Sequence, residues 1–63
     1  MDISRVKYNL GKQVRYGDRL FLLNACIMRQ GSDGFYYQAE LKDQTARSAL
    51  VIADLNEIKE ETP

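Results

Sequence analysis

Two glycine-containing turn signals bracket the longest apolar run of the chain, and they restrict its fold more than any other feature. Gly17-Asp18 precedes the run at residues 19–29, and the segment 30–34 follows it. A glycine in the first central position of a two-residue hairpin turn takes a positive φ at little steric cost. Because both flanks carry hairpin signals, residues 19–29 are predicted to form a strand, although they are poor in β-branched residues.

Shorter strands are predicted on both sides of this run. Residues 13–16 alternate between polar and apolar side chains, residues 35–41 are aromatic-rich and alternating, and residues 48–53 are apolar after a loop at 43–47. Val6, Tyr8 and Leu10 recur at a period of two before Gly11, which predicts a further strand at the N-terminus. The predicted fold is mainly β: an antiparallel meander of four to five strands.

The two hairpins predict one common register. Folding the first about Gly17-Asp18 places Val14 opposite Phe21. Folding the second about 30–34 places Leu23 opposite Leu41, Ala25 opposite Ala39 and Ile27 opposite Tyr37. A slip of one residue would reverse every side chain, so agreement across three strands supports the meander. The expected inward-facing side chains are Phe21, Leu23, Ala25 and Ile27 on the central strand, with Val14, Tyr37, Ala39 and Leu41 on its neighbours.

The register of the last apolar strand depends on the length of the loop before it. A four-residue loop turns Leu50 and Ile52 toward the core, whereas a five-residue loop turns Ala49 and Val51 inward. We favour Leu50 and Ile52, because the small side chain of Ala39 leaves volume to fill.

A short helical turn is predicted after this strand. Asp54 followed by Glu57 three residues later is a variant of the capping box, and Leu55 and Ile58 share one face of the turn. The polar residues 59–63 are expected to fray.

The composition bounds the chemistry available to this chain. Its 63 residues allow one domain, residues 1–63, and its single cysteine, Cys26, excludes an internal disulfide. Without histidine, one thiol cannot build a zinc site, and no base stands ready to activate it. We expect no catalytic residue, metal or cofactor, and hence no enzyme. The N-terminus lacks the apolar run of a signal peptide, and no segment is long enough for a membrane helix, so the expected location is cytoplasmic.

Charge is balanced overall but divided between the two halves of the chain. Residues 1–29 carry six basic and two acidic side chains, and residues 30–63 carry three basic and seven acidic ones. We expect the two halves to neutralise each other across neighbouring strands. The alternative is a basic face formed by the first half.

The N-terminal third also carries the spacing Tyr8-x-x-Gly11-x-x-Val14-x-Tyr16-x-x-x-x-Phe21. This spacing resembles the opening of many small SH3-like barrels, and the long second strand and the turn around Leu55 extend the resemblance over most of the chain. The resemblance implies a small barrel and carries over no catalytic residue. In size and general character the chain is also similar to small proteins of bacterial mobile elements.

One apolar set is expected on the face opposite the core. It suggests a non-enzymatic protein-interaction module that self-associates, because monomers seldom expose large contiguous apolar patches. Three explanations stay open: the N-terminal segment or the Leu55 turn covers this face, a partner or second copy covers it, or the register is different. The candidate residues are Leu20, Leu22, Cys26, Met28 and Tyr36.

The alternative function is nucleic-acid binding by an accessory protein. Aromatic side chains interleaved with basic ones are typical of surfaces on which bases stack and phosphates bind. Small barrels use such surfaces for nucleic acid. The candidate contacts are Lys12, Arg15, Arg29 and Tyr8, with Tyr36 beside them.

Overall fold

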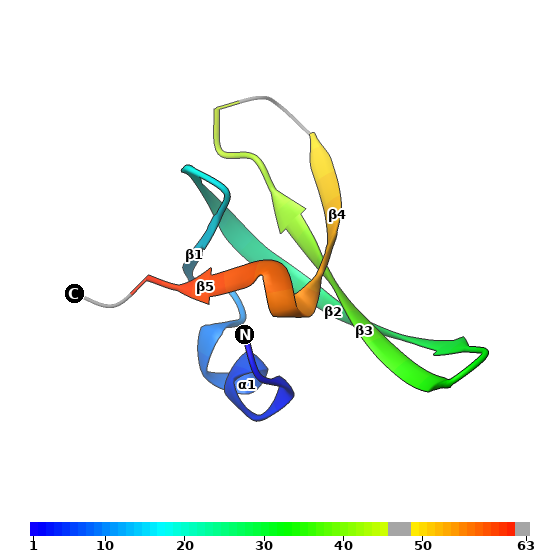
Figure 1. Cartoon of the computed structure of the whole chain (residues 1–63). Coiled ribbons are helices and arrows are strands. Elements are labelled where there is room, and N and C mark those ends of the chain that lie inside the picture. Colours follow the sequence, from blue (N-terminus) through cyan, green and yellow to red (C-terminus); the bar gives the residue numbers. More distant parts are fainter. Residues whose placement is uncertain (46–48, 62–63) are drawn as a thin grey trace.

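The computed structural model describes residues 1–45 and 49–61, and its main element is one antiparallel five-stranded sheet (Figure 1). The order β4-β3-β2-β1-β5 leaves β4 and β5 at the two edges, so the sheet is open. The expected mainly-β antiparallel class is confirmed, and the expected closure into a barrel is not. The strands are β1 (Gln13–Tyr16), β2 (Arg19–Gly31), β3 (Gly34–Lys42), β4 (Leu50–Asp54) and β5 (Ile58–Glu60).

The β1–β2 hairpin forms in the expected register. Tyr16 lies opposite Arg19 and Val14 lies opposite Phe21. Gly17 has a φ of 64°, a conformation that a side chain would disfavour and that the two-residue turn requires. Local turn chemistry therefore determines this hairpin.

The β2–β3 hairpin departs from the expected register after Leu23. Leu23 pairs with Leu41 as expected, but a bulge follows, and Ala25 then pairs with Glu40. The expected pairs of Ala25 with Ala39 and of Ile27 with Tyr37 are therefore wrong. Gly31 lies opposite Gly34, so the turn is shorter than the five residues expected, and the bulge absorbs the one-residue offset.

The bulge changes which side chains of β2 face the core. We call the face that carries Val14, Phe21 and Leu23 the inner face, and its opposite the outer face. Beyond the bulge, Cys26 pairs with the buried Ala39 on the inner face, and Ile27 turns to the outer face.

The register of β4 is the alternative that we did not favour. Leu41 pairs with Val51 and Ala39 with Ala53, which places Val51 and Ala53 on the inner face. Leu50 and Ile52 remain 53% and 45% exposed, so their predicted inward orientation is wrong. The Asp43 amide donates to the Ala49 carbonyl at 3.0 Å, which closes the longer loop. Residues 46–48, including the predicted strand start at 48, lie outside the described residues.

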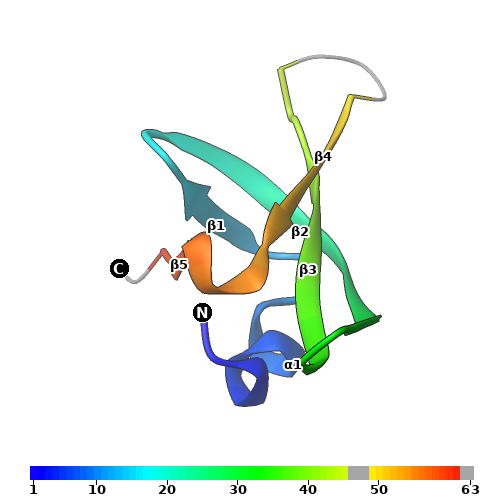
Figure 2. The ribbon, with the colours of Figure 1, turned by 45° about the vertical axis from the view of Figure 1, so that its right-hand side comes forward.

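The N-terminal segment is helical, and the strand predicted there is wrong. A 3-10 turn, η1 (Ile3–Arg5), leads into the short helix α1 (Val6–Asn9), which lies below β1 and β5 in both views (Figures 1 and 2). Val6 and Asn9 are buried one turn apart, whereas Tyr8 and Leu10 are exposed. The helical spacing of three thus buries only Val6 and Asn9 of this segment. Gly11, with a φ of 81°, follows the end of the helix.

The C-terminal segment forms a turn and a strand. Residues Leu55–Glu57 form a 3-10 turn, η2, and the helical turn expected near the C-terminus is limited to these three residues. The α-helix of this fold, α1, is near the N-terminus instead. Within the described residues Asp54 makes no capping hydrogen bond. β5 pairs with β1, with Val14 opposite Glu60. The expectation that residues 59 and 60 fray is therefore wrong. Residues 62–63 lie outside the described residues.

The core lies between the inner face of the sheet and the two helical turns. The N-terminal ammonium of Met1 donates to the carbonyls of Leu55 and Ile58, at 2.8 and 2.6 Å, and so fastens η1 to η2. The buried apolar side chains are Val6, Val14, Phe21, Leu23, Ala39, Leu41, Ala53, Leu55 and Ile58.

Candidate interaction surface

The five apolar residues expected on one outer face lie on both faces of the sheet. Leu20 and Leu22 precede the bulge and are half-buried on the outer face. Cys26 and Met28 follow the bulge and belong to the inner face, where Cys26 packs against the core. The predicted single patch is therefore wrong for these two residues, because the bulge reverses their orientation.

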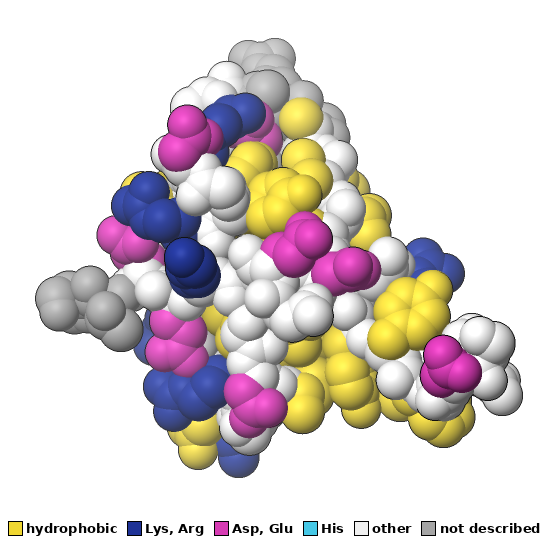
Figure 3. Space-filling view, viewed as in Figure 1, with side chains coloured by type: hydrophobic (Ala, Val, Ile, Leu, Met, Phe, Trp, Pro, Cys, Tyr) yellow, Lys and Arg dark blue, Asp and Glu magenta, His cyan; other side chains and the backbone are white. Residues whose placement is uncertain are grey.

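The far part of the β2–β3 hairpin extends beyond the core, and we call residues 27–37 the hairpin arm. The pairing of β3 with β4 ends at Gln38, and the pairing of β2 with β1 ends at Leu22. Within the described sheet, the arm's two strands therefore pair only with each other. In Figure 1 the arm extends to the right, and Figure 3 shows hydrophobic side chains over that end of the molecule.

Large apolar side chains of the arm stand in solvent on both of its faces. Phe35 is 65% and Met28 60% exposed, and Tyr36 on the opposite face is 44% exposed. Met28 and Phe35 are diagonal neighbours on one face, and exposed apolar side chains grouped in this way are typical of surfaces that contact other molecules.

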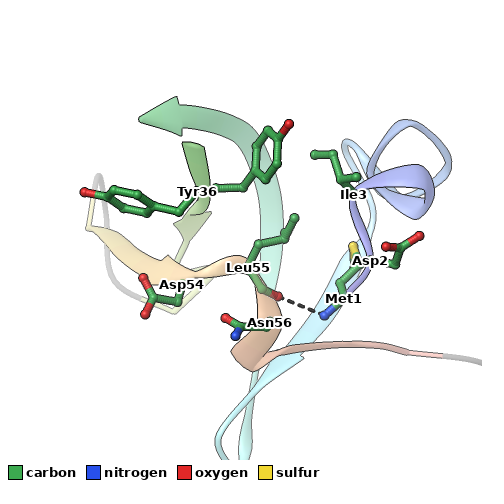
Figure 4. Close-up of a pocket in the computed structure, with 8 residues that line it drawn as sticks. Met1, Asp2, Ile3, Tyr36, Asp54, Leu55 and Asn56 are labelled. Atoms are coloured by element: carbon green, nitrogen blue, oxygen red, sulfur yellow. Dashed lines mark hydrogen bonds between the residues drawn. The ribbon is translucent and has the colours of Figure 1, made fainter. Parts of the chain in front are cut away.

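A pocket of about 530 Å³ lies at the base of the arm, which is within the range of ligand-binding cavities. Figure 4 shows Tyr36 and Asp54 on one side and Asp2 and Ile3 on the other, with Leu55 between them. The pocket is lined by three segments that are far apart in the sequence: Met1, Asp2 and Ile3, then Tyr36 and Tyr37, then Asp54, Leu55 and Asn56.

The polar rim of the pocket carries two carboxylates. The side-chain hydrogen bond from Ser4 lowers the pKa of Asp2 below its ordinary value. Asp54 is exposed on the opposite side. The only positive group among the lining residues is the Met1 ammonium, which already donates to two carbonyls. The side-chain charges of the described lining residues are therefore negative.

Tyr36 is positioned by a glycine on the neighbouring strand. A Cβ at Gly31 would meet the Tyr36 ring at 3.2 and 3.3 Å, so the ring lies directly over the glycine backbone. The ring can come this close because residue 31 is a glycine and has no Cβ. The sequence predicted Gly31 only as part of a turn, and a glycine diagonal to an exposed tyrosine is the signal that could have connected the two.

The four residues proposed for nucleic-acid contact are not brought together. Arg15 on β1 pairs with Glu61 at 3.2 Å, and Arg29 on the arm donates to Gln38. Tyr8 lies on α1 with the charged groups of Arg5 and Lys7 at 4.9 and 5.0 Å from its ring centroid. Cations already lie over this ring, so it is not an open stacking platform. Lys12 is exposed between α1 and β1.

Ion pairs join the basic half of the chain to the acidic half. Arg5 pairs with Glu60 at 2.6 Å and Arg19 with Asp43 at 2.7 Å, in addition to Arg15 with Glu61. Each pair links residues 1–29 to residues 30–61, so the expected neutralisation between the halves is confirmed for these three arginines. Figure 3 shows basic and acidic side chains side by side on the left of the molecule.

Cys26 has the character of a packed side chain. It is half-buried against the core, and burial raises the pKa of its thiol, which disfavours the nucleophilic thiolate. Among residues 1–45 and 49–61, no three His, Cys, Asp or Glu side chains gather in a group that could hold a metal ion.

The chain matches no protein-family model, no curated protein and no solved structure. None of the helices in the described part of the chain is long and apolar enough to cross a membrane.

Proposed function

We propose that this chain is a non-enzymatic protein-interaction module that binds a partner segment at the base of the hairpin arm. The observation that carries the proposal is the pocket between Tyr36, Leu55 and Ile3, together with the exposed apolar arm beside it. Protein interfaces commonly combine an apolar, aromatic centre with a polar rim.

The chemistry of the pocket indicates the kind of partner segment. Its apolar lining favours aliphatic side chains, and the carboxylates of Asp2 and Asp54 favour a basic one. We therefore propose a segment in which an arginine or lysine is flanked by apolar residues.

The fold belongs to the same proposal. We infer an open variant of the SH3-like barrel, supported by the strand order and by the 3-10 turn η2 that separates β4 from β5. SH3 domains proper bind proline-rich peptides with a tryptophan in the groove, and this chain has no tryptophan. The proposed ligand is for this reason a basic apolar segment.

A titration with matched peptides tests the proposal. The isotope-labelled protein is titrated with two blocked tripeptides, Leu-Arg-Leu and Leu-Glu-Leu, while its amide resonances are followed. We expect the arginine peptide to shift the resonances of Tyr36, Tyr37 and Asn56, and the glutamate peptide to shift them far less.

Substitutions in the rim separate charge recognition from apolar contact. Asp2→Asn and Asp54→Asn should each weaken binding of the arginine peptide about 2- to 5-fold, the range for an exposed ion pair. Glu57→Gln is the control, because it removes a carboxylate that does not line the pocket. Equal binding of both peptides, or shifts confined to other parts of the sheet, would contradict the proposal.

A further inference from the structure

The outer edge of β4 is an unprotected template for strand pairing. β4 is the last strand of the sheet on its side, and no strand in residues 1–45 or 49–61 pairs with its outer edge. From Leu50 to Ala53 it contains no lysine, arginine or proline, and Leu50 and Ile52 are exposed. Natural edge strands usually carry such residues, or a bulge, because a bare edge pairs with other chains.

The register shows which backbone groups of this edge point outward. The Asp43 amide donates to the Ala49 carbonyl, which marks Ala49 as a residue that bonds toward β3. Bonding alternates along an antiparallel strand, so Val51 and Ala53 also bond toward β3. The amide and carbonyl groups of Leu50, Ile52 and Asp54 therefore point away from the sheet.

We propose that a second copy of this chain pairs antiparallel with this edge, with Ile52 opposite Ile52 of the second copy. This register brings together only the outward-pointing groups, because it places Leu50 opposite Asp54 of the second copy. Two-fold symmetry closes the contact at two chains. The two sheets then become one continuous sheet.

Charge and side-chain chemistry select a copy of this chain in this orientation. Lys42 lies beside Leu50 on the outer face, so the antiparallel copy brings its Asp54 toward the positive end of the strand. A parallel copy would place the two Asp54 carboxylates together, which is unfavourable. The exposed Ile52 side chains of the two copies cover each other at the centre.

The contact is small, and its strength follows from its size. A single strand pair with two covered isoleucines buries less area than a standard stable interface. The dimer is accordingly weak and forms at high protein concentration. It does not rest on the proposed peptide site: the two share Asp54, but the dimer pairs the backbone edge of β4 and makes no use of Tyr36, Tyr37 or Asp2.

Hydrogen exchange on the unaltered protein gives the sharpest test. At low micromolar concentration we expect the amides of Leu50, Ile52 and Asp54 to exchange fast, and those of Val51 and Ala53 to be protected. At millimolar concentration the first three amides should become protected as well, while sedimentation shows a dimer. A monomer at millimolar concentration, or unchanged exchange at Ile52, would overturn the proposal.

A lysine introduced at the centre of the contact and a lysine introduced on the hairpin arm form a matched pair of variants. Ile52→Lys sets two like charges opposite each other and should weaken the dimer about tenfold or more. We expect the variant to fold, because Ile52 is 45% exposed and Glu40 lies directly across from it. Met28→Lys makes the same change on the hairpin arm and should leave the dimer unchanged. A dimer that survives Ile52→Lys, or that Met28→Lys removes, would place the contact elsewhere.

Discussion

Asp43 shows how one half-buried side chain can organise a loop. Its carboxylate accepts hydrogen bonds from the amide and the hydroxyl of Thr45, at 2.9 and 2.7 Å, and from Arg19. These bonds, chiefly those from Thr45, lower the pKa of Asp43 from 3.8 to about 2. The sequence showed an aspartate in a loop, but only the fold reveals that Arg19 faces it across the sheet.

The lowered pKa predicts a definite pH dependence. Because the pKa is lower in the folded state, ionised Asp43 stabilises the fold above pH 4, and this contribution disappears as the pH falls from about 4 to about 2. Asp43→Asn should therefore lower the urea midpoint at pH 7 and have a much smaller effect near pH 2. Asp18→Asn, in the exposed β1–β2 turn, is the control. A constant difference between pH 7 and pH 2 would contradict this explanation.

At the scale of elements, the sequence predicts the structure best where the local residues alone determine it. Gly17-Asp18 determined the β1–β2 hairpin, and its register was predicted correctly. The bulge after Leu23 has no composition signal, and the helical start of the chain was hidden because Val6, Tyr8 and Leu10 also alternate. Both outcomes depend on distant packing, against which local periodicity carries little weight.

The last strand provides a test at this scale. Ile58 begins β5 and is 1% exposed, so Ile58→Ala leaves a cavity and should lower the free energy of unfolding by about 2–5 kcal/mol. Lys59→Ala on the same strand removes an exposed side chain and should change it by less than about 0.5 kcal/mol. Urea denaturation measures both. Equal small effects would mean that this segment is frayed after all.

At the scale of the molecule, the candidate site is less predictable than the fold. The pocket joins residues 1–3, 36–37 and 54–56, and of the five residues predicted for the interaction surface only Tyr36 lines it. The missing step was the docking of η1 against η2 through the Met1 ammonium. No pattern within one segment can predict a contact between segments so far apart.

The same docking predicts a charge-swap result. Arg5 pairs with Glu60 and so connects the N-terminal turn to β5. Arg5→Glu should lower the urea midpoint, because two carboxylates then face each other, and adding Glu60→Arg should restore it. Lys12→Glu makes the same change of charge in an exposed loop and should have little effect. If the double variant is no more stable than Arg5→Glu, the pair does not hold these segments together.

The bulge between Leu23 and Ala25 divides β2 into two stretches that have different surroundings. Before the bulge, Phe21 and Leu23 pack in the tightly filled core, where adding or removing one methyl group lowers the stability of the fold. In the arm, Tyr37 still packs against the core and Tyr36 lines the pocket, but Met28 and Phe35 stand in solvent. Evolution or an engineer could therefore change these two exposed side chains, and with them what the arm contacts, while the core stays intact.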